Sequence, residues 1–299
     1  MSIFKGCAVA MVTAFNDKKG STSKQGINLD AQKNIIEHLI KGGVDGIVVC
    51  GTTGEPSTMT HIERDMLVEF TVKTVNKRIP VIVGSGGNDT LEAIEFSKKA
   101  EYLGADALMI VTPYYNKCTQ KGLFTHFKAI NDAVKSPIIA YNVPPRTGMT
   151  IKPETALDLS NLKNIVAIKE ASGDIHEISK IIKLTKGKMD LYSGYDSLTV
   201  PAVSLGALGV ISVAANVVPH LTKQVAHLSL QGDFKGACEV HYQLAPLMDL
   251  LFCEVNPIPA KKALEFMGFG GMQPRLPLTE METKNADKLK AELVNLGIL

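Results

Sequence analysis

Lys169 is the residue of this chain whose type and position most directly suggest chemistry. It follows a short apolar run, residues 165–168, that is bounded by turn residues and therefore predicts a buried strand. Lysine is rarely buried without a partner, and apolar walls would lower the pKa of its amine. A neutral amine is a nucleophile that can form a Schiff base with a carbonyl substrate. The alternative is a strand-end lysine whose amine reaches solvent.

Polar and aromatic side chains also follow other predicted strands. Residues 51–55 read Gly-Thr-Thr-Gly-Glu. They form either a tight turn alone or a site where Thr52 and Thr53 offer hydroxyl and N–H groups to a small carboxylate. Tyr141 is either a buried tyrosine with a satisfied hydroxyl or a phenol that exchanges protons beside the lysine. Arg146 is either a solvated loop arginine or a two-point grip for a carboxylate.

The elements that must position these groups are eight short apolar runs with helical stretches between them. The runs cover residues 7–13, 46–50, 80–83, 107–111, 137–141, 165–168, 190–193 and 209–213. Eight β-then-α units predict an α/β fold, a closed (β/α)8 TIM barrel with its active site at the carboxyl ends of the strands. An open doubly wound sheet is the alternative. No Gly-x-Gly-x-x-Gly follows the first run, which disfavours the dinucleotide-binding version of that sheet.

Helical periodicity fills the gaps between the runs. The first helix carries apolar residues over 35–40, with Asp30 as its expected N-cap and Lys41-Gly42-Gly43 as its stop. Further helices are expected at 61–75, 91–103, 122–133, 155–159, 175–184 and 195–205. After residue 213 only helical patterns follow, at 221–230, 236–252, 259–267 and 280–296. We therefore expect a catalytic barrel over residues 1–225 and a C-terminal helical region over 226–299 that packs directly on it.

Composition excludes several classes of function. Hydrophobic residues make up 45% of the chain and charged residues 21%, and the net charge is +2. These values are ordinary for a soluble globular protein and favour neither a nucleic-acid nor a membrane surface. The five cysteines are odd in number and never form a Cys-x-x-Cys pair. This usage favours a reducing cytoplasm over a disulfide frame, and it predicts no zinc site.

Six motifs occur in a fixed order along the chain. They are Gly51-Thr52-Thr53-Gly54-Glu55, Tyr114-Tyr115-Asn116, Tyr141-Asn142-Val143-Pro144, Arg146-Thr147-Gly148, Ile168-Lys169-Glu170 and Glu254-Val255-Asn256-Pro257-Ile258-Pro259. With these motifs the chain resembles, nearly end to end, the dihydrodipicolinate synthase family of pyruvate-dependent class I aldolases.

The resemblance implies an activity without a metal or an organic cofactor. It implies that pyruvate and L-aspartate 4-semialdehyde condense through a lysine Schiff base to give 4-hydroxy-tetrahydrodipicolinate, in lysine and diaminopimelate biosynthesis. It also implies a dimer as the minimal active unit, because in the family one tyrosine of the site comes from a neighbouring subunit, and usually a homotetramer built as a dimer of dimers.

The resemblance also implies a role for each site residue. Lys169 would form the imine, and the pyruvate carboxylate would lie against Thr52 and Thr53. Tyr141 would move protons, linked through the Thr53 hydroxyl to Tyr115 of a neighbouring subunit. Three further residues are implied to bind substrate or line the pocket: Arg146 for the semialdehyde carboxylate, Gly194, and the backbone carbonyl of Ile211.

Two other functions remain open on sequence grounds. The chain could share the chemistry of N-acetylneuraminate lyase or of another sugar-acid pyruvate aldolase. Thr52, Arg146 and Glu170 favour the synthase, because the lyase typically has serine at the first position and lacks the arginine. A catalytically inactive barrel that binds a keto acid is the third hypothesis, and it would be expected to lack Lys169 or Tyr141.

A feedback site for lysine is half intact. Some relatives bind lysine at the dimer interface, and the resemblance places its polar positions at His61, Asn88, Glu92 and Tyr114. Pro56 and Arg64 stand where strongly inhibited members carry a serine and a second histidine. Because Arg64 adds a positive charge near a cationic ligand, we expect weak or absent inhibition.

Overall fold

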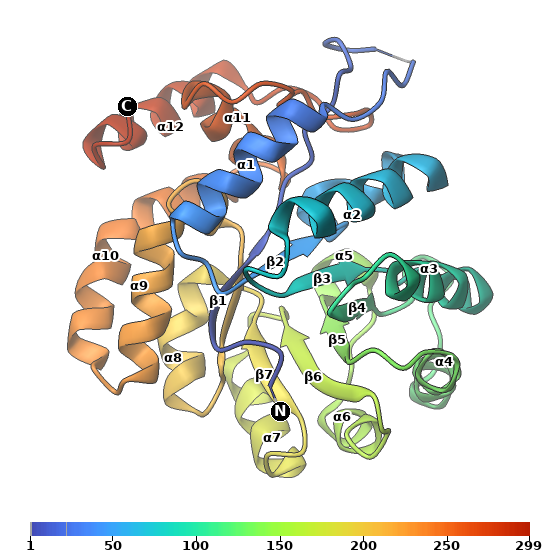
Figure 1. The fold of residues 1–299 in the computed structure, drawn as a ribbon. Coiled ribbons are helices and arrows are strands. Elements are labelled where there is room, and N and C mark those ends of the chain that lie inside the picture. Colours follow the sequence, from blue (N-terminus) through green and yellow to red (C-terminus); the bar gives the residue numbers. More distant parts are fainter. Residues whose placement is uncertain (1, 22) are drawn as a thin grey trace.

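The computed structural model describes residues 2–21 and 23–299. In this part of the chain, eight parallel strands close into a barrel in which each strand pairs with its neighbours in sequence order, and β1 pairs with β8 (Figure 1). The strands are β1 (Gly6–Ala10), β2 (Gly46–Val49), β3 (Val81–Gly84), β4 (Ala107–Val111), β5 (Ile138–Asn142), β6 (Ile165–Glu170), β7 (Asp190–Ser193) and β8 (Gly209–Ser212). The predicted TIM barrel is confirmed, and the open sheet is excluded because β1 and β8 pair along four residues.

Helices follow the strands and form the outer layer of the barrel (Figure 1). Those between strands are α1 (Leu29–Lys41), α2 (His61–Val75), α3 (Thr90–Tyr102), α4 (Gln120–Ala133), α5 (Pro144–Thr147), α6 (Pro153–Leu159), α7 (Ile175–Thr185) and α8 (Thr199–Ser204). Those after β8 are α9 (Pro219–Leu230), α10 (Phe234–Leu250), α11 (Ile258–Phe266) and α12 (Thr283–Asn295). Short 3-10 turns lie at η1 (Thr52–Gly54), η2 (Pro56–Thr58), η3 (Asp196–Leu198) and η4 (Ala214–Asn216).

The first helix begins one residue earlier than its predicted cap. The prediction that Asp30 is the N-cap is wrong, because the side chain of Asn28 accepts a hydrogen bond from the backbone N–H of Ala31. Asp30 lies instead in the first turn, where a carboxylate still interacts favourably with the helix dipole. The predicted stop is confirmed, because the helix ends at Lys41 and Gly42 is its C-cap.

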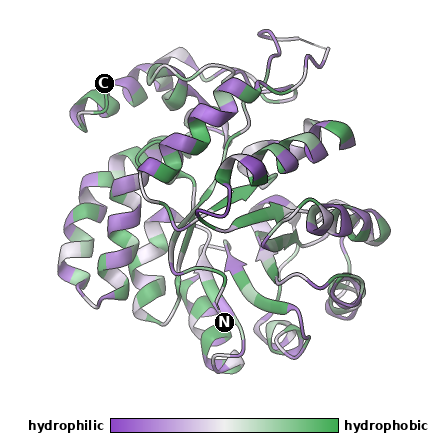
Figure 2. Cartoon of the chain, in the orientation of Figure 1, coloured by the Kyte–Doolittle hydropathy of each residue, from purple (hydrophilic) through white to green (hydrophobic). Residues whose placement is uncertain are grey.

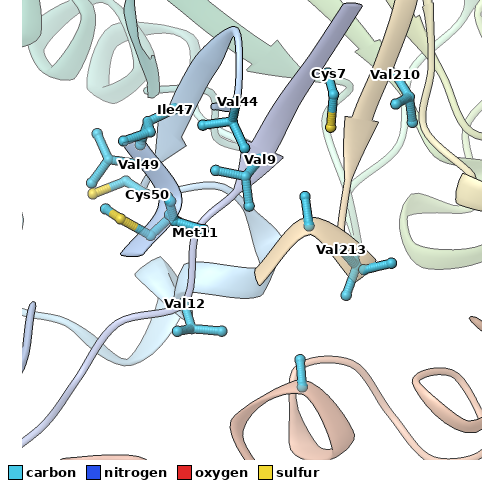
Figure 3. Packing of buried hydrophobic residues seen from close by; sticks show 14 of the residues in the cluster. Cys7, Val9, Met11, Val12, Val44, Ile47, Val49, Cys50, Val210 and Val213 are labelled. Atoms are coloured by element: carbon cyan, nitrogen blue, oxygen red, sulfur yellow. The ribbon is translucent and has the colours of Figure 1, made fainter. Parts of the chain in front are cut away.

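Alternation along the strands separates two apolar clusters. Cys7 and Val9 of β1 belong to the cluster between the barrel and its helices, where they lie with Val210 of β8 (Figure 3). Ala8 and Ala10 belong to the second cluster, which fills the barrel. Successive strand residues point to opposite faces, so each strand contributes to both clusters. In Figure 2 the strands are accordingly hydrophobic, whereas the surrounding helices mix hydrophobic and hydrophilic residues.

Phe4 and Tyr192 close the amino end of the barrel interior. Their rings stack with centroids 4.1 Å apart, and the Tyr192 hydroxyl donates to the Phe4 carbonyl oxygen at 2.8 Å. Both belong to the interior cluster, together with Ala167 of β6 and Ile211 of β8. The interior is therefore filled at this end, and side chains that carry out chemistry are expected at the carboxyl ends of the strands.

The C-terminal helices pack directly on the barrel. Helix α9 packs against β1, β8 and α10, and α12 packs against α10 and α11. The division proposed between residues 225 and 226 falls inside α9, so this helix belongs to both proposed parts. None of the helices in the described part of the chain combines the length and apolarity that a membrane-spanning segment requires.

Gly209→Ala is expected to destabilise the barrel strongly, because β1 and β8 meet closely at this residue. Gly209 has a φ of 142°, and a Cβ there would lie 1.8 Å from the carbonyl oxygen of Gly6. Strain and clash together should lower the free energy of unfolding by at least about 3 kcal/mol in a denaturant titration. Gly232→Ala is the control, since Gly232 also has a positive φ but no neighbouring atom within 4 Å of where its Cβ would lie. Equal losses in the two variants would contradict the argument.

Candidate active site

Lys169 and Tyr141 lie side by side at the carboxyl ends of neighbouring strands. They are register partners across β5 and β6, and the Lys169 Nζ lies 4.2 Å from the centroid of the Tyr141 ring. Lys169 is two residues after Ala167, a member of the interior cluster, so strand alternation aims its side chain into the barrel. Only 5% of Lys169 is exposed. The structure thus brings together a buried amine, which can form a Schiff base, and a phenol that can exchange protons beside it.

Gly194 leaves the space that the lysine stem occupies. A Cβ at Gly194 would lie 3.1 Å from the Cε of Lys169 and 2.5 Å from the Cβ of Ala171. The backbone N–H of Gly194 donates to the carbonyl oxygen of Glu170 at 2.7 Å, which fixes this approach. Ile211 is fully buried in the interior cluster that also contains Tyr141. Gly194 therefore lies beside the Lys169 stem and Ile211 in the barrel interior, and neither is among the described residues that line the cavity next to Tyr141.

Glu170 fixes the ends of β5 and β6 from the opposite strand face. Its carboxylate accepts hydrogen bonds from the Asn142 Nδ2 and the Ser172 backbone N–H, each at 2.6 Å. Burial raises the pKa of Glu170 above its usual range, although both hydrogen bonds favour the charged form. The Asn142 Oδ1 in turn accepts from the N–H of Ile151. Sequence reasoning placed Asn142 just after the predicted strand 137–141 and in a family motif, but gave it no role.

The turn after β2 presents its two threonines differently. Thr52 lines a cavity of about 330 Å³ that Tyr141, Arg146 and Tyr114 also line. Thr53 is buried, and its Oγ1 accepts a hydrogen bond from the Asn256 Nδ2 at 3.0 Å. Lys169 is not among the described residues that line this cavity, but it contacts Tyr141, which is.

Within the described part of one chain, the members of the predicted proton relay are not joined by hydrogen bonds. Among the described residues, no hydrogen bond joins Thr53 to Tyr141 or to Tyr115. Tyr115 is 91% exposed in the loop after β4, with a positive φ of 68°. Thr52 shares a cavity wall with Tyr141, so it is the threonine whose placement suits a link to the phenol.

Arg146 lies on the cavity wall and is anchored from the C-terminal region. It belongs to the short helix α5, and its Nη2 donates to the carbonyl oxygen of Asn256 at 3.1 Å. Asn256 thus contacts both Thr53 and Arg146, and its Oδ1 is buried without a described partner. Sequence reasoning included Asn256 in a family motif but gave it no role. Its two contacts join residues that are 203 and 110 positions apart in the sequence, so no local sequence pattern predicts them.

The four predicted feedback residues lie around one end of the same cavity. The His61 Nε2 is 3.5 Å from the Glu92 Oε1, and Glu92 and Tyr114 line the cavity. Asn88 directly follows Gly87, which lines the cavity, and its carbonyl oxygen accepts from the Asn116 side chain. Arg64 also lines the cavity, with its guanidinium carbon 3.9 Å from the centroid of the Phe96 ring. The Arg64 charge therefore lies in the cavity that Glu92 and Tyr114 line, at the position where strongly inhibited relatives carry a histidine.

Comparison with known proteins agrees with this geometry. The model of the dihydrodipicolinate synthetase family matches residues 3–296. This chain belongs to that family. It is 48% identical over 299 residues to the 4-hydroxy-tetrahydrodipicolinate synthase 1 of Clostridium acetobutylicum, with both chains covered completely.

Solved structures of the family have the same fold. The chloride-inhibited dihydrodipicolinate synthase of Acinetobacter baumannii, in complex with pyruvate, superposes with a TM-score of 0.95 at 42% identity and full coverage of both chains. A monomeric dihydrodipicolinate synthase variant gives a TM-score of 0.95 at 40% identity, covering 99% of this chain and 98% of the other. These relatives support the synthase hypothesis over a sugar-acid aldolase.

Proposed function

We propose that this protein condenses pyruvate with L-aspartate 4-semialdehyde to give 4-hydroxy-tetrahydrodipicolinate, a step of lysine and diaminopimelate biosynthesis. The observation that carries the proposal is the pairing of Lys169 with Tyr141 across β5 and β6, beside the cavity lined by Thr52 and Arg146. Membership of the dihydrodipicolinate synthetase family, with relatives that carry the synthase name, supports it.

Lys169 supplies the covalent step. Its amine attacks the ketone carbon of pyruvate, and the carbonyl oxygen leaves as water to give an imine. Loss of a methyl proton then gives an enamine, whose carbon attacks the aldehyde of the semialdehyde. The amine of the bound semialdehyde displaces Lys169, which closes the ring of the product and frees the enzyme. Tyr141, whose ring centroid is 4.2 Å from the Lys169 amine, is the group placed to move protons in these steps.

The turn at residues 51–55 binds the pyruvate carboxylate. Thr52 and Thr53 open the 3-10 turn η1, where backbone N–H groups are available for an anion. Thr53 is buried and its Oγ1 accepts from Asn256, whereas Thr52 lines the cavity with Tyr141, so we assign the relay hydroxyl to Thr52 and carboxylate binding by Thr53 to its backbone. Arg146 binds the semialdehyde carboxylate, because its guanidinium lies on the wall of the cavity beside Tyr141.

We also propose that Tyr115 completes the relay of a neighbouring subunit. It is exposed in this chain, and exposed apolar side chains accompany it on α2 and α3, including Ile62 and Leu91. Helices α2 and α3 pack together, so these side chains form a face suited to a partner subunit. A dimer is then the smallest unit with a complete site, and a dimer of dimers is the expected assembly.

The lysine site is proposed to respond weakly. Glu92 and Tyr114 offer acceptors for an ammonium group. Arg64 shares their cavity and repels a cation: two unit charges about 5 Å apart repel by about 3 kcal/mol at an effective dielectric constant of about 20. That is as large as a typical allosteric coupling of about 1–3 kcal/mol.

Borohydride reduction in the presence of pyruvate is expected to attach a three-carbon adduct to Lys169 alone. Peptide mass spectrometry locates the adduct, and Lys169→Ala should gain none and lose activity. Lys262→Ala is the control, because Lys262 is a partly exposed lysine paired with Glu265. An adduct on another lysine would refute the proposed chemistry.

Arg146→Ala is expected to raise the KM for the semialdehyde while pyruvate still forms the imine. Hydrogen bonds to a charged group contribute about 2 kcal/mol, which corresponds to roughly thirtyfold in affinity. Arg146→Lys keeps the charge without the two-point geometry, so its KM should lie between those of Arg146→Ala and the wild type. Steady-state kinetics with each substrate varied separately provide the measurement. Unchanged semialdehyde KM in Arg146→Ala would remove Arg146 from the site.

Tyr115→Phe is expected to lower kcat, and mixing it with Lys169→Ala is expected to restore part of the activity. In a hybrid dimer one site combines an intact Lys169 with an intact Tyr115 from the other subunit. Native mass spectrometry confirms that subunits have exchanged. Exchange without any recovery of activity would place Tyr115 in its own chain's site or outside the relay.

Millimolar lysine is expected to inhibit the wild-type enzyme weakly, whereas Arg64→His should be more sensitive because it removes the fixed charge. Initial rates at fixed substrate and increasing lysine provide the measurement. Strong inhibition of the wild type would show that Arg64 does not oppose the ligand.

A further inference from the structure

Lys261 and Glu55 form an ion pair with almost no access to solvent. The Lys261 Nζ lies 2.6 Å from the Glu55 Oε1, and their side chains are 1% and 2% exposed. The ammonium also donates to the Gln273 carbonyl oxygen at 3.0 Å and lies 4.4 Å from the centroid of the Phe15 ring. Burial lowers the pKa of Lys261, while the Glu55 carboxylate acts in the opposite direction.

A buried ion pair of this kind contributes little net stability to a fold. Removing two charges from water costs free energy that their attraction does not reliably recover, and apolar residues of similar size are often as good or better. Lysine is among the residues least often fully buried. The location of the pair is therefore informative, because Glu55 is the last residue of the Gly51–Glu55 turn that carries Thr52 and Thr53.

The backbone at Glu55 needs to be held in place. Glu55 has φ 56° and ψ 43°, in the left-handed region that side chains other than glycine rarely adopt. Its backbone N–H donates to the Thr52 carbonyl oxygen, and its own carbonyl oxygen accepts from the Thr58 hydroxyl. A shift of Glu55 would thus be transmitted directly to Thr52.

The C-terminal region contacts this turn at further points. The Arg275 N–H donates to the second Glu55 carboxylate oxygen at 3.0 Å, and the Arg275 Nη1 donates to the Thr58 carbonyl oxygen at 3.1 Å. The Asn256 side chain holds Thr53 through its hydroxyl. The outer side of the turn is therefore fixed by residues 256–275, whereas Thr52 on its inner side lines the cavity.

We propose that Lys261 is a positioning residue for the pyruvate-binding turn: through its buried bond to Glu55 it holds Thr52 and Thr53 at the distance that the pyruvate carboxylate requires. This rests on the proposed function, and it gives the C-terminal helices a role in that reaction. Lys261 does not touch substrate, so its loss weakens pyruvate binding more than it slows the chemistry of bound pyruvate.

Lys261→Met and the double variant Lys261→Met/Glu55→Gln test the proposal. In Lys261→Met we expect the KM for pyruvate to rise at least tenfold, with kcat at saturating pyruvate within about threefold of the wild type. The unfolding temperature should fall as well, because Glu55 is left as a buried unpaired charge. In the double variant that charge is gone, so stability should return toward the wild-type value while the pyruvate KM stays at least fivefold raised.

Asp45→Asn is the matched control for a purely structural effect. Asp45 pairs with His227 of α9 at 2.7 Å and accepts from the Cys7 N–H, at the amino end of the strands. This variant should lower the unfolding temperature without changing the pyruvate KM. If Lys261→Met leaves the pyruvate KM unchanged, or if the KM recovers together with stability in the double variant, the positioning role is refuted. If Lys261→Met does not fold, Glu55→Gln decides the question by the same criterion.

Borohydride trapping separates this inference from the proposed function. In Lys261→Met the adduct on Lys169 should need at least tenfold more pyruvate for half-maximal yield, and it should reach the wild-type yield at saturation. A wild-type enzyme that forms no adduct would refute the Schiff-base function and the positioning role with it. A wild-type adduct with the same pyruvate dependence in Lys261→Met would refute the positioning role alone.

Discussion

The pairing of β5 with β6 is the constraint on which the site depends. Register places Tyr141 opposite Lys169, and alternation places both on the interior face. A shift of one residue would turn the lysine toward the outer helices. On the outer face, the Asn142 side chain of β5 donates a hydrogen bond to the Glu170 carboxylate of β6, which stabilises the same strand pairing. One register therefore places both the proposed catalytic pair inside the barrel and a polar pair outside it.

Packing fills the amino end of the barrel interior and leaves space at its carboxyl end. At the amino end Phe4 and Tyr192 stack, and alanines such as Ala8 and Ala167 leave room for larger neighbours in the interior cluster. At the carboxyl end Gly194 provides the space for the lysine stem. Close packing around the buried Lys169 side chain restricts it to few rotamers. Less side-chain entropy is then lost when the amine takes up a reactive geometry.

The C-terminal region completes the carboxyl end from outside the barrel. Asn256 contacts Thr53 and Arg146, and Lys261 and Arg275 contact the turn at Glu55. Arg275 also pairs with Asp17 and Glu63, so it joins the first β–α loop, the start of α2 and the tail of the chain. Buried charged groups with fixed geometry define distances better than apolar contacts, because hydrogen bonds are directional.

The sequence by itself determined the barrel and the identity of most groups at its mouth. Eight apolar runs are long enough to be strands and spaced for one helix each, so local pattern sufficed for the architecture, and the motif around Lys169 marked the proposed nucleophile. Local pattern misplaced the first N-cap, because Asp30 and Asn28 both suit a cap and only the backbone path chooses Asn28. Only the tertiary structure decided that Thr53 bonds Asn256 while Thr52 faces the cavity, and that Lys261 is buried against Glu55. These partners are about 200 residues apart in sequence, and such contacts arise from closure of the barrel and docking of the C-terminal helices, which no local periodicity records.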